Sequence, residues 1–431
     1  MSAGICIMNK QAIALAADSA VTIGDHVAIH NSANKLFSLS RSAPVGMIIY
    51  ANATFMSVPV EIIAKQYKKY IKDTTFPKLE DYVYDFIKYI ESNNSLFIFN
   101  INENDYVRNL FIDFIRGLLG DYEQIVKQKE EIKREKLTEK EKVEAANIAV
   151  KSTIEFADSF QKIDGHHFYE YVKKTYFNDF VNIINENKEL AWLSDKQIKS
   201  VCNSACKLFD TEFDRNGYVG VAIAGYGEEE IYPRMIHLHF EGYVNGKVRY
   251  YVQEQAKISE DVLGSIVPLA QTDVMQTFLF GINDGFLNDL SMEIPKQIDE
   301  VMNHIDNKYF ASGKKEIVKR QLNGVTGKII EHMADIASRN YMLPIIQSVS
   351  TLPIEELALL AESMINITSL RRKVALDRNI GTVGGPIDVA IITKGDGLIW
   401  LKRKHYFDPK YNPQYFYSHF DKIDKGETYD E

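Results

Sequence analysis

The sequence predicts an α+β fold in which helices cover an antiparallel double sheet. Short apolar runs between polar or glycine-containing turns lie toward both ends of the chain. A long segment whose apolar residues have helical spacing separates them, and further helical segments follow the later strands. Strands, helices, strands, helices and strands, in that order, are typical of helices packed on antiparallel sheets.

The N-terminal region, up to residue 60, predicts strands. Ala3–Met8 and Ala12–Ala17 are apolar runs separated by the polar Asn9–Gln11, and Val27–His30 and Val45–Ala51 follow them. None of these runs is long enough for a buried helix, so their length favours strands.

Residues 61–214 predict an all-helical subdomain. Pro77 is the only proline in this range. A segment of about 150 residues is large enough to fold as its own unit. Apolar residues recur at helical spacing over roughly Tyr106–Leu119, Glu139–Phe160, Phe168–Ile184 and Asp195–Leu208.

Strands return after Gly217, and tight turns join some of them. Asn245-Gly246 and Lys394–Gly397 are hairpin signals. The predicted strands are Val219–Ala224, Arg234–Phe240, Val248–Val252, Ile387–Thr393 and Leu398–Lys402. The predicted helices between them are Thr272–Phe280, Pro295–Ile305, Lys315–Ser338 and Pro353–Arg371. Residues 1–60 and 215–405 are therefore predicted to form one core, with 61–214 inserted into it and 406–431 as a C-terminal tail.

The composition restricts the classes of function. The formal net charge is −9 and the basic residues are spread along the chain, which argues against a nucleic-acid partner. No apolar run is long enough to span a membrane, and the N-terminus is not built like a signal peptide. Cys6, Cys202 and Cys206 are too few for a disulfide framework. We therefore expect a cytoplasmic protein without a membrane partner.

One motif is fixed to the N-terminus. Ser2–Ile7 is followed by Ala12–Asp18, which ends in Ala-Ala-Asp, and Lys35 lies in Asn-Lys-Leu-Phe further on. These segments resemble the opening of proteasome β subunits and their bacterial relatives, which are N-terminal-nucleophile (Ntn) hydrolases. Counted from Ser2, Asp18 stands at the spacing of that family, and the interval from Asp18 to Lys35 is one residue longer. Gly384-Gly385 and the strand after it resemble the last Gly-Gly turn of the family.

The resemblance implies a four-layer αββα sandwich with an inserted all-helical subdomain. It also implies that several copies assemble into a homo-oligomer, and that the substrate is a peptide or another amide. It implies no metal and no organic cofactor. The helical insertion is a possible site for a protein partner.

The resemblance further implies that Ser2 becomes the nucleophile once Met1 is removed. A serine hydroxyl is a weak nucleophile and needs a base within hydrogen-bond reach. A free α-amino group has a reference pKa of about 7.7–8.0, so the amine of Ser2 can accept that proton near neutral pH. A cationic Lys35 would lower the proton affinity of this amine, and Asp18 would hold Lys35 in place.

The resemblance also implies roles for two further positions. The turn after Val45–Ala51 corresponds to the oxyanion turn of the family, with the backbone N–H of Ala51 as the donor. The family has a Gly-Ser-Gly segment before a helix, where this chain has Ala270-Gln271-Thr272. Thr272 and Gln271 are the candidates that replace the family's serine.

Two alternatives stay open at this stage. The first is a catalytically inactive relative that serves in assembly or sensing, with a partner bound to the helical insertion. The second is a metal-dependent hydrolase, because His237 and His239 alternate on one predicted strand and Glu241 follows them. Histidines on strands are more often structural than metal ligands.

Overall fold

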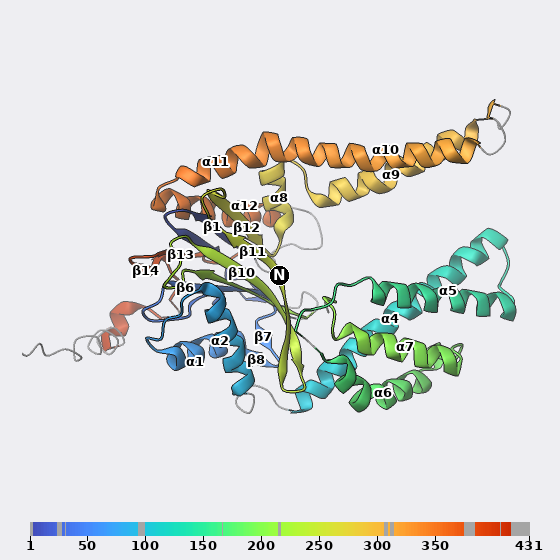
Figure 1. The fold of residues 1–431 in the computed structure, drawn as a ribbon, viewed down its shortest axis with the longest axis horizontal. Helices are drawn as coiled ribbons and strands as arrows, with labels where there is room; N and C mark the ends of the chain where they lie inside the picture. Colours follow the sequence, from blue (N-terminus) through green and yellow to red (C-terminus); the bar gives the residue numbers. More distant parts are fainter. Residues whose placement is uncertain are drawn as a thin grey trace, which may run out of the picture.

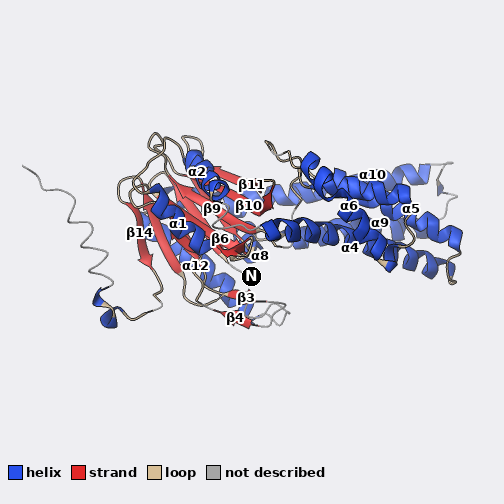
Figure 2. Ribbon diagram, turned by 90° about the horizontal axis from the view of Figure 1, so that it is seen from below, coloured by secondary structure: helices blue, strands red, loops and turns tan. Residues whose placement is uncertain are grey.

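The computed structural model describes residues 3–23, 28–30, 32–93, 100–165, 167–213, 217–305, 309–310, 314–374, 384–405 and 407–414. Within them the strands form two five-stranded antiparallel sheets and two short two-stranded ones (Figures 1 and 2). The chain is therefore a mixed α/β protein with antiparallel sheets, as the sequence predicts.

The first sheet contains strands from both ends of the chain. Its strand order is β12-β1-β2-β13-β14. These strands are β1 (Gly4–Asn9), β2 (Ile13–Ala17), β12 (Gly264–Leu269), β13 (Asp388–Thr393) and β14 (Gly397–Lys402). The N-terminal strand thus lies in the interior of a sheet, between β12 and β2.

The second sheet has the strand order β11-β10-β9-β6-β5. These strands are β5 (Leu36–Ser38), β6 (Val45–Ala51), β9 (Val219–Gly225), β10 (Arg234–Val244) and β11 (Lys247–Lys257). The short sheets pair β3 (Val21–Ile23) with β4 (Ala28–His30), and β7 (Thr54–Phe55) with β8 (Val58–Pro59).

The two large sheets bury side chains against each other. Met8 and Leu15 of the first sheet share a buried cluster with Ile48 and Ala222 of the second. At Gly4 the sheets come so close that a Cβ atom would lie 3.2 Å from Cγ2 of Ile48. The start of β1 therefore lies directly over β6.

Helices pack on the outer faces of the sheets. α1 (Val60–Ile71) and α2 (Leu79–Ser92) cover the second sheet, where Tyr67 and Phe86 share a cluster with Val221. α11 (Leu343–Thr351) and α12 (Ile354–Val374) cover the first sheet, where Val349 and Ala361 share a cluster with Ile5. α8 (Thr272–Phe280) also packs on the first sheet, because its Met275 belongs to the same buried cluster.

Two helical units extend away from the sheets on one side of the molecule (Figures 1 and 2). The first unit has its own buried cluster and contains α4 (Asn100–Lys133), α5 (Glu139–Asp158), α6 (Tyr169–Glu186) and α7 (Asp195–Leu208). The second is a helical pair, α9 (Asp284–His304) and α10 (Lys314–Ala337), with a π-helical stretch over Ser338–Met342 before α11. None of the helices in the described residues is long and apolar enough to cross a membrane.

Arg249 joins the first helical unit to β11. Its side chain is completely buried and donates hydrogen bonds to the carbonyl oxygens of Leu208, Phe209 and Thr211, at 3.2, 3.0 and 2.6 Å. The carboxylate of Glu241 lies 3.6 Å away. A guanidinium with five donors can satisfy the carbonyl groups that α7 leaves unpaired at its C-terminus.

Two elements differ from the sequence-based prediction. The helix expected to start at Pro295 starts at Asp284, because the side chain of Asn283 caps it by accepting a hydrogen bond of 2.8 Å from the N–H of Phe286. Strand β12 was not predicted at all. It contains Pro268, and a proline is tolerated there because β12 stands at the edge of its sheet.

Candidate functional site

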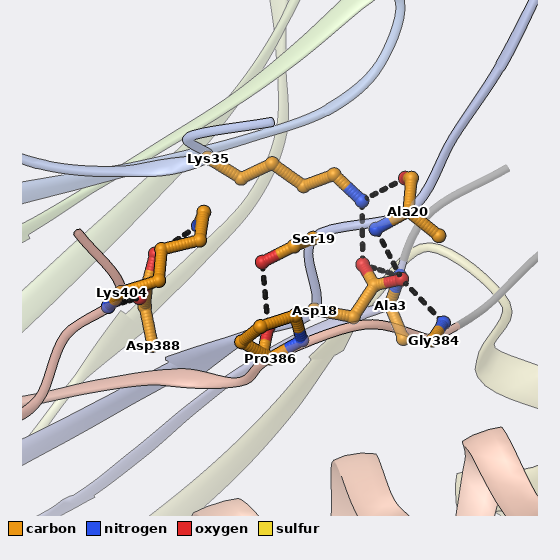
Figure 3. A network of polar contacts seen from close by, with 9 residues as sticks. All are labelled: Ala3, Asp18, Ser19, Ala20, Lys35, Gly384, Pro386, Asp388 and Lys404. Atoms are coloured by element: carbon orange, nitrogen blue, oxygen red, sulfur yellow. Dashed lines mark hydrogen bonds and ion pairs between the residues drawn. The ribbon is translucent and has the colours of Figure 1, made fainter. Parts of the chain in front are cut away.

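A buried ion pair lies where β2 ends. Asp18 follows the last residue of β2 and Lys35 precedes β5, so the pair joins the two sheets. Nζ of Lys35 is 2.5 Å from Oδ1 of Asp18, and the two residues are 3% and 1% exposed (Figure 3). A buried pair of this kind is costly to desolvate and persists only when further hydrogen bonds support it.

Backbone groups supply that support. Oδ1 of Asp18 also accepts a hydrogen bond of 2.9 Å from the N–H of Ala3. Oδ2 accepts hydrogen bonds from the N–H groups of Ala20 and Gly384, at 3.2 and 3.1 Å. With the Lys35 ammonium, these three N–H groups make four donors. A carboxylate has only acceptors, so its two oxygens can accept from all four. The carboxylate therefore connects the N-terminal strand, the loop after β2 and the segment before β13.

The same segment before β13 is held by Ser19. Its N–H donates to the carbonyl oxygen of Gly384 at 3.1 Å, and its hydroxyl donates to that of Pro386 at 2.5 Å (Figure 3). Gly385 lies between them with φ of +77°, a conformation that glycine adopts without steric cost. The Gly-Gly turn singled out in the sequence thus lies directly beside Asp18.

Burial lowers the pKa of the Lys35 ammonium below its ordinary value. The charge and the hydrogen bond of Asp18 act in the opposite direction, and the positive charge of Lys404 adds to the lowering. Lys404 itself forms an ion pair with Asp388 (Figure 3). Lys35 therefore releases its proton more readily than a lysine in water.

Ser2 is outside the described residues. Its neighbour Ala3 carries the N–H that Asp18 binds. The other two predicted site residues, Ala51 and Thr272, lie toward the end of the sheets at which β1 begins. Ala51 ends β6 with φ of +61°, a left-handed conformation that is uncommon outside glycine. Thr272 begins α8, three positions after Leu269, which pairs with Gly4. Within the described residues, neither Ala51 nor Thr272 hydrogen-bonds to Asp18 or Lys35.

A cavity of about 630 Å³ opens beside Thr272. The aromatic rings of Tyr50 and Tyr218 and the imidazoles of His237 and His239 line part of it. No sequence pattern pointed to the two tyrosines, because they reach this space only through the pairing of β6, β9 and β10.

The two histidines are bound by tyrosines. The Tyr50 hydroxyl contacts Nε2 of His237 and, at 2.9 Å, Nε2 of His239, whose Nδ1 lies 2.9 Å from the hydroxyl of Tyr251. Burial lowers the pKa of His237 to about 3, and the nearby His239 contributes. Among the described residues no group of three or more potential metal ligands gathers here or elsewhere. Within the described residues, His237 and His239 therefore have no third ligand with which to form a metal site.

Comparisons with known proteins give a distant match. No family model matches the chain, and no curated protein matches it. Solved structures that it resembles include Anbu proteins. They include a Gly-1 mutant of Anbu from Hyphomicrobium sp. strain MC1, with 9% identity, a TM-score of 0.28 and coverage of 100% of both chains.

Two further Anbu structures match at a similar level. The helical assembly of the Anbu complex from Pseudomonas aeruginosa has 8% identity and a TM-score of 0.30, covering 99% of this chain and 98% of that one. Anbu, described as an ancestral β-subunit, from Yersinia bercovieri has 8% identity and a TM-score of 0.27, covering 99% of this chain and 100% of that one.

Proposed function

We propose that this protein is an Ntn amidohydrolase or peptidase whose nucleophile is Ser2 after removal of Met1. The observation that carries the proposal is the hydrogen bond from Ala3 to Asp18, which also holds the Lys35 ammonium. It brings a buried ion pair to within one residue of the proposed nucleophile. The proposal includes the fold of that family, an αββα sandwich. Because α1 and α2 pack on the second sheet as an outer layer, the inserted subdomain comprises α4–α7 rather than all of residues 61–214.

The chemistry follows from the groups at the start of β1. The hydroxyl oxygen of Ser2 attacks the carbonyl carbon of the amide, and its proton passes to the free α-amine. The amine returns this proton to the leaving nitrogen as the C–N bond breaks, which leaves an acyl-enzyme. Water then attacks the acyl carbon and releases the acid. Lys35, held by Asp18, supplies the positive charge that keeps the α-amine unprotonated before attack.

The conformation of Ala51 supports its proposed role as the oxyanion donor. A left-handed alanine costs about 1–2 kcal/mol relative to the right-handed form. Backbone strain of this kind occurs preferentially at functional sites. Ala51 stands at the end of β6, the strand that β1 overlies through Gly4 and Ile48. Its turn is therefore close to the end of the sheets where Ser2 is attached.

We also propose that several copies of the chain assemble into a homo-oligomer. The helical pair α9–α10 exposes large apolar side chains, including Phe286, Val301 and Ile317, which are 51%, 60% and 56% exposed. Contiguous exposed apolar surface marks interaction sites in soluble proteins.

The test of catalysis starts from the intact mass, which shows whether Met1 has been removed. The purified protein is then tested against a panel of fluorogenic peptide amides, together with Ser2→Ala, Ser2→Thr and the control Ser42→Ala, which changes an exposed serine. We expect wild type, Ser2→Thr and Ser42→Ala to hydrolyse an amide, and Ser2→Ala to have lost activity with an unchanged melting temperature. Hydrolysis that persists in Ser2→Ala would refute the mechanism. Full retention of Met1 would favour the non-catalytic assembly module.

A further inference from the structure

The cavity beside Thr272 has an uneven distribution of charge. Glu254 is the carboxylate among its lining residues, and no lysine or arginine of the described residues lines it. Within those residues no hydrogen bond or ion pair engages the Glu254 side chain. The side chain keeps contact with solvent, yet neighbouring atoms displace enough water to raise the pKa of its carboxyl. An uncompensated carboxylate at a cavity wall attracts a cation.

His237 does not neutralise this charge. Burial keeps His237 uncharged at neutral pH, since its pKa lies at about 3. The protons of His237, His239, Tyr50 and Tyr251 are shared within one chain of hydrogen bonds. Glu254 therefore places a negative charge on the polar part of the lining, and this charge repels a carboxylate or a phosphate.

Another part of the lining is apolar. Pro268 of β12, Leu279 and Phe280 of α8, and Ile346 of α11 contribute to it. A ligand that matches both Glu254 and these apolar residues has an apolar stem and a cationic end. Lysine and arginine side chains have this build, with an aliphatic stem that packs on apolar surface and a charged head that does not.

The cavity lies close to β1, the strand that follows the proposed nucleophile. Its lining includes Ala270 and Thr272, which follow the residue that pairs with Gly4 of β1. Its other end lies on β10 and β11, where His237 pairs with Glu254. Neighbouring strands are about 4.8 Å apart, so the cavity begins roughly one strand from β1. A side chain next to a bond cleaved at Ser2 can extend from β12 toward β11.

We propose that this cavity binds a basic side chain of the substrate, with Glu254 as its counter-charge. The inference rests on the proposed hydrolase function and adds the class of substrate: peptides or amides that carry a lysine-like or arginine-like group beside the cleaved bond. Glu254 acts in specificity and takes no part in bond cleavage.

Binding is measured first, in the Ser2→Ala protein, so that it does not depend on catalysis. The probes are n-pentylguanidine, its neutral isostere n-pentylurea, and hexanoate, each titrated by calorimetry. We expect the guanidine to bind more tightly than the urea, and hexanoate most weakly. Glu254→Gln should weaken guanidine binding about fivefold, as expected for a half-exposed ion pair, and leave urea binding unchanged. Glu131→Gln removes an exposed carboxylate from α4 and serves as the control. Equal binding of guanidine and urea, or tighter binding of hexanoate, overturns the proposal.

Cleavage is measured second, with wild type and matched amides that carry arginine, glutamine or glutamate beside the scissile bond. A preference for arginine that Glu254→Gln reduces supports the proposal. Hydrolysis without that preference overturns it and leaves the proposed function intact. Guanidine-selective binding without hydrolysis of any substrate overturns the proposed function, while the assignment of the cavity to a basic group stands.

Discussion

Asp18→Asn tests whether the buried carboxylate organises the site. Each carboxylate oxygen accepts two hydrogen bonds, Oδ1 from Ala3 and Lys35, and Oδ2 from Ala20 and Gly384. An asparagine has one carbonyl oxygen and one NH₂ group, so in either orientation its NH₂ faces two donors. Two hydrogen bonds to a charged acceptor are lost, each worth about 1.5–3 kcal/mol. We therefore expect the free energy of unfolding to fall by about 3–6 kcal/mol.

The assay uses a tryptophan that reports on the sheets. The chain has two tryptophans, Trp192 in the helical region and Trp400 on β14, which packs against the cluster between the sheets. In a Trp192→Phe background the fluorescence of Trp400 follows the unfolding of the sandwich in urea. Asp261→Asn, at an exposed position, is the control and should stay within about 0.5 kcal/mol of the parent.

A double-mutant cycle with Lys35→Met separates the pair from its surroundings. Lys35→Met leaves Asp18 with three N–H donors and no counter-ion, and we expect it to cost about 3–5 kcal/mol. In the double variant the NH₂ of asparagine can face the Oδ1 side, where only the N–H of Ala3 remains. The two changes should therefore be non-additive by about 1–3 kcal/mol. Strict additivity, or a loss below about 1 kcal/mol for Asp18→Asn, would refute the reasoning.

Two further predictions concern buried polar groups. The pKa of His237 is about 3 in the folded protein and about 6.5 for a histidine in the unfolded chain, so below pH 6.5 the unfolded chain binds a proton that the folded chain does not. Stability present above pH 6.5 is therefore lost as the pH falls, by about 2 kcal/mol between pH 6.5 and 4.5 at about 1.36 kcal/mol per pKa unit. Urea unfolding at both pH values should show this loss in wild type and not in His237→Asn; an equal loss in both would contradict it. Arg249→Met removes the donor to the C-terminal end of α7 and the buried guanidinium that lies 3.6 Å from the carboxylate of Glu241, which should cost about 3–5 kcal/mol. Hydrogen exchange should rise first around residues 208–213, and unchanged protection there would exclude the proposed role of Arg249.

Most of the helices, strands and tight turns could be predicted from the sequence, and those that could not have physical reasons. Asn245 and Gly246 both have positive φ, at +52° and +76°, as a two-residue hairpin requires. β12 was missed because Pro268 argues against a strand, and nothing in the sequence says that this strand stands at an edge. The start of α9 was misplaced because a proline is a weaker signal than the Asn283 cap.

The sequence could predict only those site residues that stand at a characteristic spacing from the N-terminus. Asp18 and Lys35 were singled out by their distance from the N-terminus, and the structure brings their side chains into contact. The cavity could not be anticipated, because its walls come from elements far apart in the sequence, such as Tyr50, Glu254 and Ile346. Which side chains face one another there depends on strand register across the second sheet, which no local pattern specifies.

The hydrogen bonds of Asp18 determine when such a site can form. The carboxylate needs Ala3 from β1, Lys35 before β5, and Gly384 before β13. β13 also pairs with β2 along its length, from Asp388 opposite Ala17 to Ile392 opposite Ile13. A chain that lacks its last hundred residues therefore has neither the third support of the carboxylate nor the neighbouring strand of β2. In the proposed mechanism, the nucleophile Ser2 is therefore positioned only when β13 has joined the sheet. Because non-local contacts form late in folding, the geometry at Ser2 depends on completion of the whole core.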